Sequence, residues 1–270
     1  MAPCLACFHA TGCGYFLAEN EISCLRTDKI NTKVLIMSIE MTAASGPGLI
    51  EANPGSRERE NVPQSRSEIS RGEIVKAAER LFAERGIDSV SMVEIGQEAG
   101  QKNRSAVQYH FGDKAGVLRA IREKHQLVIE AHRIEMLDQL EASSEATLRD
   151  FVEVFVLPLA ERLIEADGGV AYVRISASLI GHSEYSTLSS EAITQKTAAR
   201  LFGHFLRKGQ PLPGSLIPAR MLLITSMVFH GLANWSRLPE QNGGVSRERL
   251  DEFSRDLVTC VVSVLKTPSV

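Results

Sequence analysis

The sequence predicts an all-α fold in which three short helices precede a larger helical region, and three observations support this prediction. The composition is 44% hydrophobic but only 6% aromatic, a balance that favours helices over sheets. Apolar residues recur at helical spacing from about residue 74 onward. No alternating apolar and polar run bounded by turn residues competes with that pattern. With 270 residues, the chain can hold a small domain followed by a larger one.

Residues 1–64 show no sustained hydrophobic period and become rich in Gly, Pro, Ser and Glu after residue 43. We expect them to form a disordered arm. The Cys-x2-Cys-x5-Cys spacing that begins at Cys4 lacks the second ligand pair of a structural zinc site, so no metal is expected. A translation start at Met37 or Met41 would leave the residues before it outside the native protein.

Cysteine usage and hydropathy indicate a soluble, cytoplasmic protein. Four of the five cysteines lie in the first 24 residues, so no disulfide framework runs through the fold. The first basic residue is Arg26, after the first apolar residues, which does not fit a secretory signal. The most apolar window, residues 221–229, is shorter than the roughly 20 residues that a membrane span needs. No membrane partner is expected.

A first helix is predicted from Ser67 to Gly86. Its apolar residues fall at i, i+3, i+4, i+7 and i+8, which places them on one buried face: Ile74, Ala77, Ala78, Leu81 and Phe82. Gly86 ends this helix, since glycine tolerates the left-handed conformation. The sequence SMVE, Ser91–Glu94, then predicts a capping box. A second helix therefore begins at about Met92 and ends at Gly100.

The stretch AGQKNRSAVQYHFGDKAGVL, residues 99–118, crowds amide, basic and aromatic side chains onto about two helical turns. Asn103 is placed to cap a short third helix, with Arg104 and Ser105 in its first turn. We expect an inward face of Ala106, Val107 and Phe111. Three short helices of which the last is polar and aromatic are typical of a helix-turn-helix.

Gly112 ends the third helix, and Asp113 is placed to cap a long fourth helix over Lys114–Glu141. Further apolar helical segments follow, separated by Gly, Pro or Ser. Their expected bounds are roughly Glu145–Ala166, Gly169–Ile180, Ser189–Arg207, Ser215–Leu238 and Arg247–Leu265.

The segment from about Ser67 to Ile121 resembles the TetR/AcrR family of bacterial transcriptional regulators. The resemblance is carried by IVKAAERLFAERG, SVSMVEIGQEAG and YHFGDKAGVLRAI, in that order and spacing. It implies an N-terminal three-helix DNA-binding domain over residues 65–121 and a larger helical ligand-binding and dimerisation domain over residues 122–270. It also implies a sequence-specific regulator, a repressor that binds a palindromic operator as a homodimer and is released by a small-molecule effector.

The chain departs from the family pattern just before the third helix. Nine residues, 101–109, separate Gly100 from the His-Phe pair, where family members usually have eight. Gln108 stands where the family usually has Tyr, with Tyr109 beside it. The role of the helix is therefore carried over, but not each of its contacts with the operator.

Residues 65–125 carry 11 Lys and Arg against 9 Asp and Glu, although the whole chain has a net charge of -3. A double-stranded DNA partner fits this locally basic segment. We expect base-edge contacts from Arg104, Ser105 and Gln108, because arginine suits guanine and glutamine suits adenine. The expected phosphate contacts are Lys102, Tyr109, His110 and Lys114, of which Lys114 also follows from the resemblance. Asn103 completes the predicted DNA-binding set.

The last two predicted helices are the candidates for a homodimer interface, because the family pairs its final helices and LVTCVVSVL is apolar nearly all round. A possible small-molecule effector would bind among the middle helices. The candidate pocket residues are Tyr172, Arg174, His182, His204, Met227, Phe229, His230 and Trp235. No cofactor is expected.

Residues 126–270 contain no nucleophile motif, phosphate-binding glycine loop or spaced metal-ligand pair, so an enzyme is not expected. Two alternatives stay open at this point. One is a helical module whose helix-turn-helix binds another protein, and the other is a transcriptional activator without a small-molecule effector.

Overall fold

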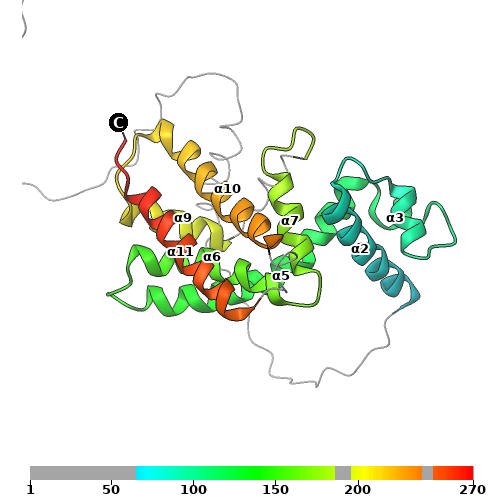
Figure 1. The fold of residues 1–270 in the computed structure, drawn as a ribbon, viewed down its shortest axis with the longest axis horizontal. Helices are drawn as coiled ribbons and strands as arrows, with labels where there is room; N and C mark the ends of the chain where they lie inside the picture. The colour runs from blue at the N-terminus through cyan, green and yellow to red at the C-terminus, as the bar shows by residue number, and fades with distance from the viewer. Residues whose placement is uncertain (1–64, 186–195, 239–245, 270) are drawn as a thin grey trace, which may run out of the picture. The chain divides into compact units, whose positions relative to one another are not determined.

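A computed structural model of the chain describes residues 65–185, 196–238 and 246–269, all within one compact unit (Figure 1). The described residues are helical, as predicted. The α-helices are α2 (Arg66–Arg85), α3 (Met92–Glu98), α4 (Ala106–Phe111), α5 (Lys114–Glu141), α6 (Leu148–Glu161), α7 (Gly169–Leu179), α9 (Lys196–Lys208), α10 (Ile217–Trp235) and α11 (Arg247–Lys266). Short 3-10 turns occupy Arg162–Ile164 and Gly214–Leu216. The predicted arm and the start of the helix predicted from Ser189 lie outside the described residues.

Residues 66–121, here called the head, share one apolar core. Ile74 and Ala78 of α2, Ile95 of α3, Val107 of α4 and Val117 of α5 are each at most 1% exposed. The stripe predicted for the first helix is thus its core face. Burial of a large aliphatic side chain contributes about 1.5–3 kcal/mol, so this stripe fixes how α2 packs on its neighbours.

Local capping signals set where the head helices begin. Ser65 and Glu68 form a capping box, so α2 begins at Arg66, one residue before the predicted start. The capping box predicted at Ser91 is present and begins α3 at Met92. The side chain of Asp113 accepts a hydrogen bond from the Gly116 amide at 2.7 Å, and α5 has the predicted bounds. Because α5 runs on past residue 121, the head and the body (residues 122–269) share one continuous helix.

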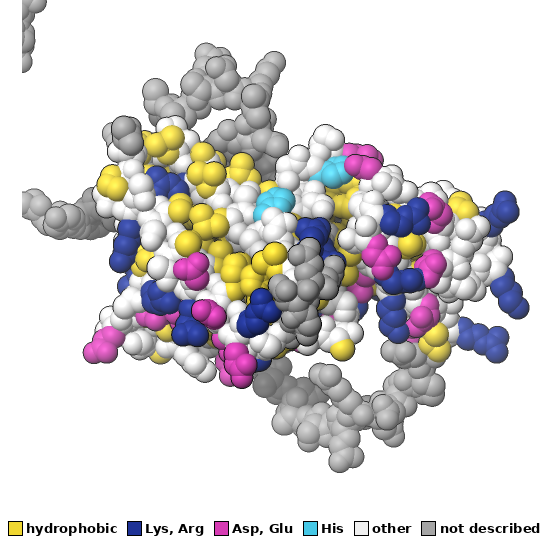
Figure 2. Space-filling model, viewed as in Figure 1, with side chains coloured by type: hydrophobic (Ala, Val, Ile, Leu, Met, Phe, Trp, Pro, Cys, Tyr) yellow, Lys and Arg dark blue, Asp and Glu magenta, His cyan; other side chains and the backbone are white. Residues whose placement is uncertain are grey.

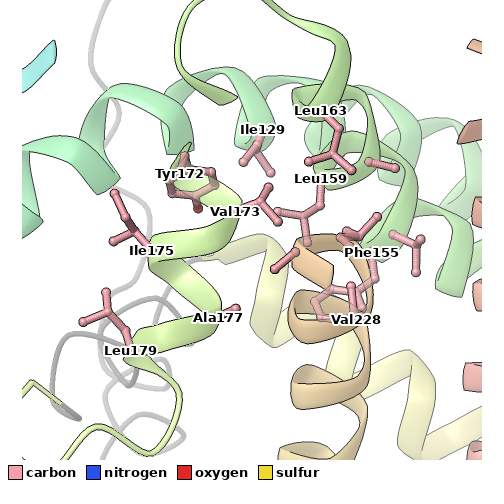
Figure 3. Packing of buried hydrophobic residues seen from close by; sticks show 14 of the residues in the cluster. Ile129, Phe155, Leu159, Leu163, Tyr172, Val173, Ile175, Ala177, Leu179 and Val228 are labelled. Atoms are coloured by element: carbon pink, nitrogen blue, oxygen red, sulfur yellow. The ribbon is translucent and has the colours of Figure 1, made fainter. Parts of the chain in front are cut away.

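The body is built around α6, whose side chains are buried on most of its circumference. Figure 3 shows side chains of three other helices converging on Phe155 and Leu159 of α6: Ile129 of α5, Val173 of α7 and Val228 of α10. Except for Phe155, at 5%, these residues are at most 2% exposed.

The helix predicted over Glu145–Ala166 is shorter at both ends. A capping box of Thr147 with Asp150 delays its start to Leu148. At the other end, α6 gives way to the 3-10 turn after Glu161, and Gly168, with φ of 96°, precedes α7. The turn between α6 and α7 brings the charged residues Arg162 and Asp167 next to the head, which the sequence pattern did not indicate.

The apolar stretch around α10 is longer than the sequence window suggested. The 3-10 turn and α10 together form a 22-residue segment, Gly214–Trp235, that could cross a membrane by length and composition. Leu222 and Leu223 are 57% and 60% exposed. Figure 2 shows hydrophobic side chains gathered over this region, beside α11. An exposed apolar surface of this kind marks a site of interaction.

Candidate nucleic-acid interface

The first helix of the helix-turn-helix, α3, is anchored at its N-terminus by paired polar groups. The Ser91 amide donates to Glu94 Oε2 at 2.8 Å, and the Glu94 amide donates to Ser91 Oγ at 3.2 Å. Arg85 of α2 also donates to Glu94, at 2.6 Å. The Ser91 amide bond first, and then Arg85, lower the pKa of Glu94 from 4.5 to about 2. These bonds hold α3 against the end of α2.

The turn between α3 and α4 differs from its prediction in where the helix begins. Asn103 Oδ1 accepts from the Ser105 amide at 2.9 Å, which is a bond within the turn before the helix. The N-cap of α4 is Ser105, which makes no side-chain capping bond, and the helix begins only at Ala106, so Asn103 does not cap it as predicted. Arg104 and Ser105 therefore lie in the turn, not in the first turn of the helix as predicted. The Asn103 carbonyl accepts from the Ala106 amide, three residues on, which makes this segment a tight turn.

The two faces of α4 are clearly divided. Ala106 and Val107 are buried, as predicted, whereas Gln108 is exposed and Tyr109 is 83% exposed. Val107 packs so close to α3 that a Cβ at Gly96 would lie 3.2 Å from its Cγ2. The buried face thus fixes α4 against α3, and the polar and aromatic face is left to meet a partner.

His110 and Phe111, at the end of α4, are half-buried. The rings of His110 and Tyr109 form a T-shaped pair, with centroids 5.2 Å apart. Phe111 packs against the core, as predicted, and the exposed Arg71 lies over its ring at 5.4 Å. Sequence reasoning missed Arg71, because a residue on α2 reaches α4 only through the tertiary packing.

Lys114 forms a hydrogen bond within the fold that the sequence did not reveal. Its Nζ donates to the carbonyl of Ile87 at 3.0 Å, and the side chain is half-buried. This bond ties the first turn of α5 to the loop after α2. An ammonium has three donors, so a phosphate contact by Lys114 stays a prediction.

The cations on α2 differ from those in the turn before α4 in whether they are ion-paired. On α2, Lys76, Arg80 and Arg85 form ion pairs with Glu73, Glu98 and Glu94. Lys102 and Arg104 are exposed, and neither forms an ion pair with a residue that the structure describes. Lys and Arg side chains project from the end of the molecule near α3 (Figure 2). The turn before α4 therefore carries positive charge that is available to phosphates.

The predicted effector-pocket residues do not surround one cavity. Tyr172 is buried and stacks on His125 at 4.6 Å, and burial raises its pKa. Arg174 donates to the Ser236 hydroxyl at 3.0 Å. His182 Nε2 lies 3.3 Å from Asp88 of the head.

The other predicted pocket residues lie elsewhere. His204 stacks on Phe151 at 3.8 Å. On α10, Met227 and Phe229 pack against the core and His230 is exposed. Of the predicted residues, Trp235 alone lines the open surface hollow of about 590 Å³ next to α11, where it stacks on Phe253 at 5.3 Å. Helical spacing placed these residues in the body but could not show which of them face one another.

A model of a family described as "Bacterial regulatory proteins, tetR family" matches residues 74–121, which include α3, α4 and the start of α5. Two curated proteins of Pseudomonas putida are similar over 186 residues, covering 63% of this chain and 82% of each relative. They are the probable HTH-type transcriptional regulator ArpR, 29% identical, and the HTH-type transcriptional regulator TtgR, 28% identical.

Similar solved structures include NalD of Pseudomonas aeruginosa, the secondary repressor of the MexAB-OprM multidrug efflux pump. It is 20% identical, with a TM-score of 0.47, over 75% of this chain and 98% of NalD. A TetR family transcription regulator from Marinobacter aquaeolei VT8 is 17% identical, also with a TM-score of 0.47, over 72% of this chain and 96% of that one.

Proposed function

Because the chain belongs to the TetR family of bacterial transcriptional regulators, we propose that it is a repressor that binds, as a homodimer, an operator with two half-sites. The observation that carries this proposal is the divided surface of α4. One face is locked into the head core, and the other presents exposed polar and aromatic groups beside the exposed cations of the preceding turn. A helix with that division is suited to the major groove of DNA.

In this proposal the exposed residues of α4 and of the turn before it, here called the reading surface, contact either base edges or phosphates. Gln108, on the exposed face of α4, contacts a base edge, together with Arg104 and Ser105 from the turn before it. Contacts to the phosphates come from Lys102, Tyr109, His110 and Lys114, and Arg71 joins them from α2. Asn103 acts by shaping the turn that presents Arg104.

The proposed dimer surface is the exposed apolar face of α10 with the neighbouring face of α11. Leu222 and Leu223 are more than half exposed, although such side chains gain about 1.5–3 kcal/mol each when they are fully buried. Next to α10, α11 presents the small side chains Cys260 and Ser263 to solvent, which permits close approach of another helix. Pairing with a second copy would cover the apolar segment without a membrane.

We propose that the chain acts in the cytoplasm by binding and not by catalysis. Its curated relatives, ArpR and TtgR, are named as transcriptional regulators. A small-molecule effector that binds the body and lowers operator affinity fits this function.

Mapping of the DNA fragments bound by the chain across its genome tests the proposed function. The expected result is a few sharp peaks upstream of genes, each containing two related half-sites. A variant with Gln108→Ala and Arg104→Ala serves as the control and should lose these peaks. Bound fragments that share no sequence, or peaks that the control retains, would refute the proposal.

A further inference from the structure

Three buried ionisable side chains lie where the head meets the body. Glu79 of α2 is 3% exposed, His125 of α5 is fully buried, and Arg162 of the turn after α6 is 1% exposed. A charge away from water is tolerated only when partners replace its hydration. The bonds among these side chains are therefore obligatory, and they cross from the head to the body.

Two consecutive residues of α5, in the part of that helix that belongs to the body, hold Glu79 of the head. Lys124 Nζ lies 3.0 and 2.8 Å from the two carboxylate oxygens, and His125 Nε2 lies 2.8 Å from Oε1. The same ammonium donates to the carbonyl of Asp167 at 2.6 Å. Lys124 thus binds α2 and the turn between α6 and α7 at once.

On the body side, Arg162 completes the connection. Its Nη2 lies 2.7 Å from His125 Nδ1 and 2.6 Å from Asp167 Oδ1. A guanidinium can only donate, so Nδ1 of His125 accepts and the ring proton lies on Nε2, from which it is donated to Glu79. One rigid ring, stacked on Tyr172 of α7, therefore joins an acceptor of the head to a donor of the body.

The backbone of the turn is shaped around this cluster. Gly168 has φ of 96°, and a Cβ there would lie 2.5 Å from Glu79 Oε2. A Cβ on Gly169 would collide with the carbonyl oxygen of Arg162. The turn can approach the Glu79 carboxylate because both positions are glycine.

We propose that the cluster of Glu79, His125 and Arg162 fixes the angle of the head on the body, and thereby selects the spacing between the two operator half-sites. This inference rests on the proposed function of the chain as a dimeric operator-binding protein. In a twofold dimer, the separation of the two reading heads follows from the angle that each head makes with its own body.

The physical reason lies in the directionality of the bonds. Apolar contacts between helices permit small rotations at little cost, whereas hydrogen bonds of 2.6–2.8 Å weaken steeply when their angles change. Burial strengthens the two bonds of His125 further, because no water competes for their donors. Buried ionic groups are also better attested as devices that specify one geometry than as sources of net stability.

The test measures the affinity of the full chain for duplexes in which the two half-sites of a mapped operator are separated by spacers differing by single base pairs. Glu79→Gln keeps the size of the side chain but removes its charge. Glu73→Gln is the matched control, since Glu73 lies on the same helix, is 52% exposed and pairs with Lys76 at the surface. In the Glu79 variant, the affinity ratio between the best spacer and one that is a base pair longer should fall about tenfold, as when one hydrogen bond to a charged group is lost. Base preferences within each half-site should not change.

A purely structural role of the cluster predicts a different result. Destabilising the head would weaken binding at every spacing in proportion and leave the ratio unchanged, which would overturn the inference. If Glu79→Gln does not fold, Lys124→Met carries the same expectation, because Lys124 is 32% exposed and its stem can keep its packing. Failure of the unmodified chain to prefer any operator over shuffled DNA would instead refute the proposed function itself.

Discussion

At the scale of single residues, neighbours on α4 have different physical tasks. Val107 is buried against α3, whereas Gln108 and Tyr109 stand in solvent one and two positions later. Sequence periodicity predicted this division, because the apolar slots of a short helix are fixed by its own pitch. The partner of Lys114 could not be predicted, since the Ile87 carbonyl lies 27 residues away and is brought near only by the fold.

Gln108→Ala and Lys102→Ala should affect DNA binding in different ways. Loss of Gln108 should cost about 1–3 kcal/mol on the operator and relax the preference at one position of each half-site. Loss of Lys102 should weaken binding to all sequences alike and make the salt dependence shallower by about one unit per head. Titrations against randomised operators measure both effects, and Lys76→Ala, on the ion-paired surface of α2, is the control.

Lys114→Ala should resemble Lys102→Ala in its effect on DNA but should also lower the stability of the head, because it removes the bond to the Ile87 carbonyl. Identical loss of contrast between operators in the Gln108 and Lys114 variants would contradict these assignments.

Phe111→Ala should act through the core of the head. Phe→Ala at a fully buried site costs about 3–5 kcal/mol, and we expect about 2–3 kcal/mol here because Phe111 is half-buried beneath Arg71. Chemical unfolding measures this loss directly. The loss of operator binding should then track the fraction of unfolded protein, and a binding defect without any change in stability would show that Phe111 is part of the reading surface.

At the scale of helices, capping residues close in sequence predicted where helices begin, whereas contacts between distant residues could not be predicted. The starts of α3 and α5 follow from Ser91 and Asp113, whose capping bonds are made within three residues. The start of α4 was placed too early, because the extra turn residue lets Asn103 close a tight turn before the helix begins. The cluster around Glu79 left no local signal, since it joins residues 37 to 46 positions apart.

The capping box of α3 should make the stability of the head depend on pH. Folding lowers the pKa of Glu94 to about 2, so its contribution to stability is fully present above the unfolded value of 4.5 and is lost as the pH falls toward 2. Glu94→Gln should therefore flatten the pH dependence of the unfolding free energy between pH 4.5 and 2. Unfolding curves followed by circular dichroism measure it, with Glu84→Gln on the exposed end of α2 as the control. An unchanged slope in the Glu94 variant would show that the cap does not couple to folding.

At the scale of the whole molecule, the exposed leucines of α10 lead us to expect a homodimer. Leu223→Glu should convert the dimer to a monomer, because a second copy would have to bury the new charge. Leu127→Glu is a matched control, since Leu127 is 75% exposed on α5, away from the proposed dimer surface. Sedimentation equilibrium distinguishes the two states. A Leu223→Glu variant that stays dimeric would place the interface elsewhere.

One experiment tests both dimerisation and DNA recognition. The full chain is titrated against its mapped operator and against a shuffled duplex of equal length, over a range of salt concentrations. Affinity for both duplexes should fall with salt at a log-log slope of about -0.9 per phosphate neutralised. At physiological salt the operator should be bound about 10³-fold or more tightly than the shuffled duplex, with two chains per operator. Equal affinity for the two duplexes, or an affinity that does not change with salt, would contradict the account of α4 as a helix that reads DNA.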